Sequence, residues 1–166
     1  MVLFNKFIKE NGQGLIEAMV ALGAAVIVIS TIAVAVITAV NNSDFSKNQN
    51  TASAYAQQGL EIVRDKAENN WTTFSTYTST YCLNKDVTDL ATRPDSQGNC
   101  ALIDNVFVRK INISQNDSNC TNGTGSKVKS MVSWSDGKCT DTVNNKYCHT
   151  VQLESCMANI NSVPSL

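Results

Sequence analysis

Residues 18–40 read AMVALGAAVIVISTIAVAVITAV, a run of 23 residues that contains neither a charged side chain nor a proline. An α-helix rises about 1.5 Å per residue, so this run reaches roughly 35 Å, more than the roughly 30 Å of hydrocarbon in a bilayer. Helices buried in soluble cores seldom exceed about 14 residues without a polar face. The stretch therefore predicts a membrane-spanning helix, and it decides how the rest of the chain must be arranged.

The flanks of this run predict its orientation. Lys6 and Lys9 precede it closely, whereas residues 41–44 (NNSD) follow it. Positively charged flanks tend to stay on the cytoplasmic side of a membrane. We therefore expect the N-terminus to face the cytoplasm and everything after about residue 40 to lie outside it.

A cleaved signal peptide is the alternative interpretation of the same N-terminus. Such a peptide also begins with lysine and continues apolar, and residues 33–35 (AVA) form a small-residue site of the required kind. Two features argue against it. The apolar run exceeds the roughly 7 to 15 residues of a signal core, and a carboxylate, Glu17, stands directly before it.

Glu17 is the most informative residue of the sequence. An ionisable group beside or inside hydrocarbon costs roughly 2 to 3 kcal/mol even on lenient scales, so it needs a partner. Its own helix offers no cation nearby. The plainer alternative is an interfacial glutamate whose carboxylate reaches the lipid headgroups.

Residues 12–22 read GQGLIEAMVAL, and this stretch resembles the processing motif of bacterial type IV prepilins and type II secretion pseudopilins. In that family a dedicated peptidase on the cytoplasmic face cuts after the glycine, leaves the apolar helix on the mature protein and methylates the new amino terminus. The fifth residue after the cut is a glutamate. The resemblance therefore implies cleavage between Gly12 and Gln13, loss of residues 1–12 as a leader, and Glu17 as the matching glutamate.

The resemblance also implies a partner for Glu17, the terminal ammonium of Gln13 in a neighbouring subunit. Opposite charges attract far more strongly in a low-dielectric bundle than in water, so subunits would dock in the register that joins them. The sequence departs from the family at two points. Gln13 stands where phenylalanine is most common, and an N-terminal glutamine can cyclise and lose its charge. The helix also lacks the proline that kinks many major pilins, which leaves Gly23 as its only obvious weak point.

The helical pattern continues beyond the membrane segment. Apolar residues recur at steps of four, four, three and four and form one stripe: Ala52, Ala56, Leu60, Val63 and Ala67. Gly59 lies within this stripe and costs about 1 kcal/mol relative to alanine, unless close packing requires it. We expect a helix over residues 13–70, with residues 18–40 in the membrane and residues 41–70 outside, whose stripe lies on a wall of β-structure.

The β-structure against which this stripe would pack is predicted in the C-terminal part of the chain. Three runs read as strands, at residues 105–114, 127–135 and 149–157. Alternation gives each run one apolar face: Phe107, Ile111 and Ile113; Val128, Val132 and Trp134; Val151, Leu153 and Met157. Turn-rich stretches separate the runs and favour an antiparallel meander over residues 105–166. Residues 71–104 show little periodicity, and we interpret them as a variable connecting loop.

The predicted fold class is α+β and type IV pilin-like: one long N-terminal helix, transmembrane in its first half, packed on a small antiparallel sheet. The resemblance covers the N-terminal third most strongly, and pilin-like proteins share this plan.

All six cysteines follow the membrane segment, so the redox compartment agrees with the topology, and an even number outside the cytoplasm indicates disulfides. Six cysteines permit 15 pairings. In a meander the second strand holds Cys120 and Cys139 about 30 Å apart at its opposite ends, whereas the third strand returns and brings Cys156 toward Cys120. The predicted pairs are Cys120–Cys156, Cys139–Cys148 inside the second turn, and Cys82–Cys100 closing the connecting loop.

Several function classes find no support in the sequence. Thirteen Lys and Arg against 14 Asp and Glu give a net charge of -1, so nucleic acid is not an expected partner. No glycine-rich phosphate loop, serine elbow or histidine-anchored triad is present, so we expect neither an enzyme nor a small-molecule substrate. With no Cys-x-x-Cys and a single histidine, His149, which we interpret as the first residue of a strand, we expect no metal and no cofactor. Sequons at Asn112, Asn119 and Asn122 permit glycan attachment or arise by chance in an Asn-rich chain.

The sequence therefore predicts a structural subunit, more similar to minor, modification-type pilins than to an abundant shaft subunit. Its expected partners are membrane lipid before assembly, the prepilin peptidase, an inner-membrane assembly platform and other pilin or pseudopilin subunits. It would start in the cytoplasmic membrane and end in an extracellular or periplasmic filament. The alternative is a secreted or membrane-anchored cysteine-rich binding or adhesion module that never polymerises. A mature chain starting at Gln13 favours the pilin, and one starting after Ala35 favours the secreted module.

Overall fold

Two compact units divide the chain, Met1–Lys47 and Asn48–Leu166. The computed structural model describes residues 11–86, 89–96, 98–120, 125–137, 139 and 147–159, and for residues 11–13 it describes the backbone alone. Most of the predicted leader, with Lys6 and Lys9, and the sequon at Asn122 lie outside the described residues.

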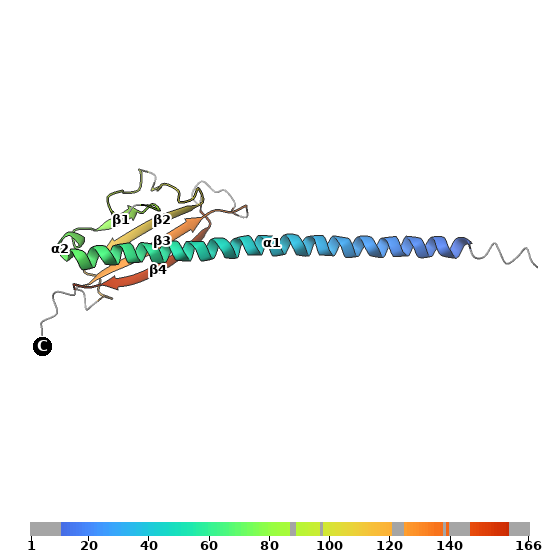
Figure 1. The fold of residues 1–166 in the computed structure, drawn as a ribbon, viewed down its shortest axis with the longest axis horizontal. Coiled ribbons are helices and arrows are strands. Elements are labelled where there is room, and N and C mark those ends of the chain that lie inside the picture. The colour runs from blue at the N-terminus through green and yellow to red at the C-terminus, as the bar shows by residue number, and fades with distance from the viewer. Residues whose placement is uncertain are drawn as a thin grey trace, which may run out of the picture. The chain divides into compact units, whose positions relative to one another are not determined.

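One helix, α1 (Asn11–Asn69), has 59 residues and belongs to both units (Figure 1). It begins two residues before the predicted start and ends at the predicted asparagine pair. Asn70 ends it because its backbone leaves the helical region, with φ -152° and ψ 86°. The Asn70 side chain then accepts a hydrogen bond of 2.9 Å from the Thr73 backbone N–H and caps the short helix α2 (Trp71–Phe74).

The second unit contains a four-stranded sheet in the order β1-β2-β3-β4, in which every neighbouring pair is antiparallel. Its strands are β1 (Ser79–Cys82), β2 (Phe107–Ser114), β3 (Ser126–Trp134) and β4 (His149–Met157). The C-terminal part of α1 lies along one face of this sheet (Figure 1). The predicted α+β layout, a long N-terminal helix packed on a small antiparallel sheet, is confirmed.

The interpretation of residues 71–104 as a connecting loop needs correction. This region contains α2 and β1, and β1 pairs with β2 so that Tyr81 faces Ile111. Leu83 and Leu90 from the same region are fully buried. A strand of four residues (STYC) offers too few positions for an apolar alternation to stand out, which is why periodicity missed it.

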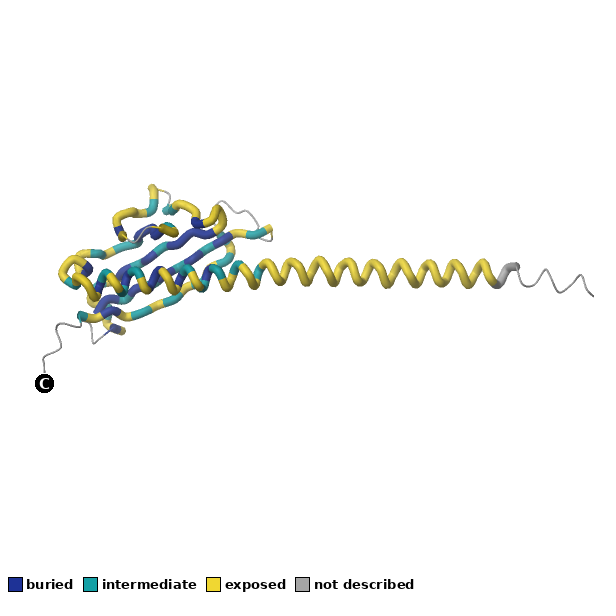
Figure 2. The backbone as a smooth tube through the Cα atoms, viewed as in Figure 1, coloured by how far each residue is buried: buried dark blue, intermediate teal, exposed yellow. Residues whose placement is uncertain are grey.

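The predicted stripe of α1 forms the helical side of the core. All five of its residues are buried, whereas the residues between them, apart from Gly59, are half-buried or exposed (Figure 2). The predicted apolar faces of β2 and β3 are buried opposite them. The face of β4 is covered less completely, since Val151 and Leu153 are only half-buried. The periods of 3.6 and 2 therefore located the helix–sheet interface correctly.

Gly59 lies where α1 comes closest to the sheet. A Cβ atom at this position would lie 2.6 Å from the Ser130 hydroxyl oxygen, 3.0 Å from Ile111 Cδ1 and 3.2 Å from Arg109 Cδ. The close packing that would justify a glycine within the stripe is therefore present.

Replacing Gly59 by alanine is expected to destabilise the helix–sheet unit. The gain of about 1 kcal/mol in helix propensity is outweighed by an overpacking cost of about 1 to 3 kcal/mol. Denaturant unfolding of the full chain in detergent, followed by tryptophan fluorescence, measures the difference. The double variant G59A/S130A should recover most of the loss, and G23A, whose new Cβ meets nothing within 4 Å, is the control. A Gly59→Ala chain as stable as the wild type would contradict the close approach.

Arg109 is a buried cation between α1, β2 and the segment that follows β1. It is 1% exposed. Its Nε donates to the Leu83 carbonyl at 3.0 Å, its Nη2 to the Asn84 carbonyl at 2.8 Å, and its Nη1 to the Tyr55 carbonyl and to Gln58 Oε1, both at 2.9 Å. Burial lowers the pKa of the guanidinium to about 10, so it stays charged at neutral pH.

Candidate assembly site

The first unit presents an apolar helical surface. Every residue from 14 to 44 is exposed (Figure 2), and the large apolar side chains are exposed by about half to two thirds of their surface, up to 68% for Leu22. Of the helices in the described part of the chain, one is long and apolar enough to cross a membrane, and it lies near the N-terminus. A surface of this kind requires an apolar environment, either lipid or protein.

The polar side chains within this surface are satisfied by the helix itself. Ser30 donates its hydroxyl to the Val26 carbonyl at 2.8 Å, Thr31 to the Val28 carbonyl at 2.8 Å, and Thr38 to the Val34 carbonyl at 2.9 Å. Because an unsatisfied hydroxyl in hydrocarbon is costly, these bonds let three polar residues remain in the span at little expense.

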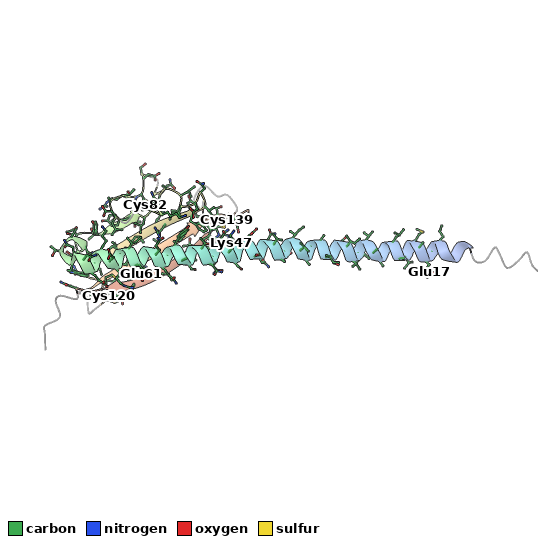
Figure 3. All side chains as sticks on the ribbon, viewed as in Figure 1. Glu17, Lys47, Glu61, Cys82, Cys120 and Cys139 are labelled. Carbon is green, nitrogen blue, oxygen red and sulfur yellow. A yellow bond between two sulfur atoms is a disulfide. The ribbon has the colours of Figure 1, made fainter. Side chains whose placement is uncertain are left out.

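Glu17 is the one acidic side chain of residues 14–40 and lies near the start of the apolar surface (Figure 3). Its side chain is exposed, and it forms no ion pair within the described residues. The backbone of Gly12 and Gln13 lies in the first turn of α1, five residues and four residues before it. The structure therefore places the predicted cleavage position and Glu17 on consecutive turns at one end of the helix.

The three predicted disulfides lie in the second unit, which contains the sheet. The structure contains Cys82–Cys100, Cys120–Cys156 and Cys139–Cys148, with Cα–Cα distances of 5.4, 5.4 and 5.5 Å. These are the three pairs that the meander predicts. Each bridge stabilises a small domain by roughly 2 to 4 kcal/mol, which suits a sheet that one helix segment covers on one face.

Two lysines and one glutamate meet on the face of the sheet that points away from α1. Lys127 and Lys129 of β3 lie 2.8 and 3.1 Å from the two carboxylate oxygens of Glu154 on β4. These two hydrogen bonds lower the pKa of the Glu154 carboxyl to about 2. One carboxylate offsets one of the two lysine charges, so these three side chains together keep a net charge of +1.

A second group of polar side chains gathers where the chain enters β4. The ligand-type atoms of Asp136, Cys139, Cys148 and His149 all lie within 4.8 Å of one another. His149 is the first residue of β4, as predicted, and its Nε2 lies 3.0 Å from Asp136 Oδ2. Its ring is tilted against Trp134 at a centroid distance of 5.2 Å.

Sequence reasoning missed two of these features, and each left a weak signal. Arg109 has the same parity on β2 as the predicted inward residues Phe107 and Ile111, so alternation alone placed it inside. The adjacency of Cys148 and His149, with Asp136 three residues before Cys139, was visible in the sequence. The predicted Cys139–Cys148 disulfide implies that the chain returns here, but the sequence does not give the distance between Asp136 Oδ2 and His149 Nε2, which is 3.0 Å in the structure.

The comparisons with known proteins found no matching protein family, no matching curated protein and no matching solved structure. The function is therefore argued from the residues and their arrangement.

Proposed function

We propose that this chain is a subunit, of the minor kind, of a type IV pilus or a related secretion filament, and that it polymerises through the apolar surface of α1. The observation that carries the proposal is the exposed apolar helix of membrane length with a single carboxylate near its start. A helix of this kind would be held by lipid before assembly and by the helices of neighbouring subunits afterwards. Neither environment is aqueous, so the transfer between them costs little hydrophobic energy.

Glu17 makes that transfer directional. In lipid the carboxylate lacks a counter-charge, and it stays near the headgroups at a cost of up to about 2 to 3 kcal/mol. In the filament it would pair with the amino terminus of Gln13 from an adjacent subunit. That amino terminus exists only after cleavage behind Gly12, so cleavage by the peptidase would be required before the subunit can assemble.

The remaining partners follow from this proposal. The prepilin peptidase would act at the cytoplasmic face, and an inner-membrane assembly platform would extract the processed subunit. The disulfide-closed sheet unit would lie outside the cytoplasm, where an oxidising environment keeps its three bridges formed. There it would contribute to the surface of the filament.

The mature amino terminus tests the proposal. Mass spectrometry of the chain purified from producing cells is expected to find Gln13 first, methylated or cyclised, with residues 14–40 retained. Replacing Gly12 by leucine should leave the uncleaved precursor in the membrane. Replacing Gly14 by alanine is the control, because the new Cβ meets nothing within 4 Å and the cleavage position is unchanged. A mature chain that begins after Ala35 would instead establish the secreted module.

A further inference from the structure

Four side chains at the start of β4 have the composition of a metal site, but the two cysteines among them form a disulfide. Asp136 offers a carboxylate oxygen, His149 an imidazole nitrogen, and Cys139 and Cys148 one sulfur each, all within 4.8 Å. Two sulfurs, one nitrogen and one oxygen form a four-ligand set suited to a tetrahedral Zn²⁺ ion. While the disulfide is intact the sulfurs cannot act as thiolates, and the set is incomplete.

We propose that reduction of the Cys139–Cys148 disulfide creates a zinc site formed by Asp136, Cys139, Cys148 and His149. The ligands of a tetrahedral zinc lie about 2.0 to 2.3 Å from the ion and hence roughly 3.3 to 3.8 Å from one another. His149 Nε2 and Asp136 Oδ2 are already 3.0 Å apart. They need to separate by only a few tenths of an ångström to admit the ion between them.

The two sulfurs must move further, and their backbone positions allow it. Their Cα atoms are 5.5 Å apart. Rotation of both side chains about the Cα–Cβ bond separates the sulfurs without requiring a shift of β4. The Trp134 ring packs against the His149 ring, with centroids 5.2 Å apart and an interplanar angle of 30°, and such packing lowers the entropic cost of holding the imidazole as a ligand.

This disulfide differs from the other two in that neither of its cysteines is buried. Each of the other two has one buried member, Cys82 at 2% exposed and Cys120 at 1% exposed. Neither Cys139 nor Cys148 is buried. A thiolate reductant approaches one sulfur in line with the S–S bond, and in this pair neither cysteine is protected by burial.

The chemistry balances with a dithiol as reductant. Two electrons and two protons pass from the dithiol to the protein, the Cys139–Cys148 bond breaks into two thiols, and the reductant becomes a disulfide. Binding of Zn²⁺ then releases the two thiol protons to solvent, because the ligands are thiolates. A disulfide oxidant reverses the sequence: it takes two electrons from the two zinc-bound thiolates and two protons from solvent and becomes a dithiol, while the Cys139–Cys148 bond forms again and the ion is released. The site would therefore hold metal only where the compartment is reducing or before the disulfide has formed.

Cobalt(II) is the probe for this site, since a tetrahedral cobalt–thiolate centre absorbs in the near ultraviolet and visible. The full chain in detergent is treated with limiting dithiothreitol, the reductant is removed without oxygen, and alkylation with peptide mapping identifies the reduced cysteines. One Co²⁺ per chain is expected for the reduced protein, displaced by Zn²⁺, and none for the oxidised protein. Circular dichroism must stay native in both forms.

Variants decide which residues bind the metal. C139S/C148S should lose the cobalt–thiolate absorption, and His149→Ala and Asp136→Asn should each weaken metal binding by at least about tenfold. C120S/C156S and Asp117→Asn are the controls and should leave the binding unchanged. The proposal is overturned if the natively folded, Cys139–Cys148-reduced chain gives no thiolate absorption, or if H149A binds as tightly as the wild type.

Discussion

A chain in which Glu17 is replaced by alanine is expected to be inserted, processed and folded normally, and yet to be nearly absent from filaments. The substitution removes the carboxylate that would pair with the amino terminus of Gln13 in the neighbouring subunit. That pair would lie among apolar helices, where breaking it leaves an uncompensated ammonium at a cost of several kcal/mol. Since about 1.4 kcal/mol is a factor of ten, incorporation should fall by at least about tenfold.

Immunodetection of the chain in sheared filaments and in membranes measures this effect, with mass spectrometry of the amino terminus to verify cleavage. Glu17→Gln separates charge from shape, because it keeps the size of the side chain and should fail as completely. Glu61→Ala is the matched control on the same helix (Figure 3). Glu61 is exposed and forms one ion pair within the described residues, with Arg64 at 2.7 Å, so its loss costs at most about 1 kcal/mol. Normal incorporation of the Glu17→Ala chain would refute the pairing role.

The agreement between sequence and structure has a physical basis at α1. A helix that meets a sheet on one side must repeat its apolar residues every 3.6 positions, and Ala52, Ala56 and Val63 obey that period and are fully buried. The same logic with period 2 located the inward faces of β2 and β3. Burial that is enforced by a regular element is therefore visible in a single sequence.

Burial that results from contacts between irregular segments could not be predicted from the sequence. Leu83 and Leu90 enter the core from a region without periodicity, and β1 is too short to have one. Sequence patterns alone did not single out Arg109, because its acceptors are mostly backbone carbonyls, which every residue carries. A sequence pattern does not indicate which backbone carbonyls will accept hydrogen bonds from a side chain. The burial of Arg109 therefore becomes evident only when α1, β2 and the segment after β1 are placed together.

Replacing Arg109 by methionine is expected to destabilise the helix–sheet unit by about 3 to 5 kcal/mol, a large share of the roughly 5 to 15 kcal/mol that holds a small domain folded. Methionine fills a similar volume but donates no hydrogen bond. The carbonyls of Leu83, Asn84 and Tyr55 then lose a charged donor in a place that water reaches poorly. Guanidinium unfolding of the full chain in detergent, with the disulfides intact and Trp134 fluorescence as the signal, measures the loss.

Lys110→Met is the matched control, because Lys110 is the next residue of β2, points to the opposite face of the sheet and is not buried. A change within about 0.5 kcal/mol is expected there. Arg109→Lys tests the geometry of the donor. A lysine ammonium keeps the charge, but it is a compact group without the planar array of N–H donors that lets the guanidinium bond to α1 and to the segment after β1 at the same time. Most of the stability lost in Arg109→Met should therefore also be lost in Arg109→Lys. If Arg109→Met unfolded at the same denaturant concentration as Lys110→Met, the guanidinium would not be what joins α1 to the segment after β1, and the apolar stripe alone would have to hold the helix on the sheet.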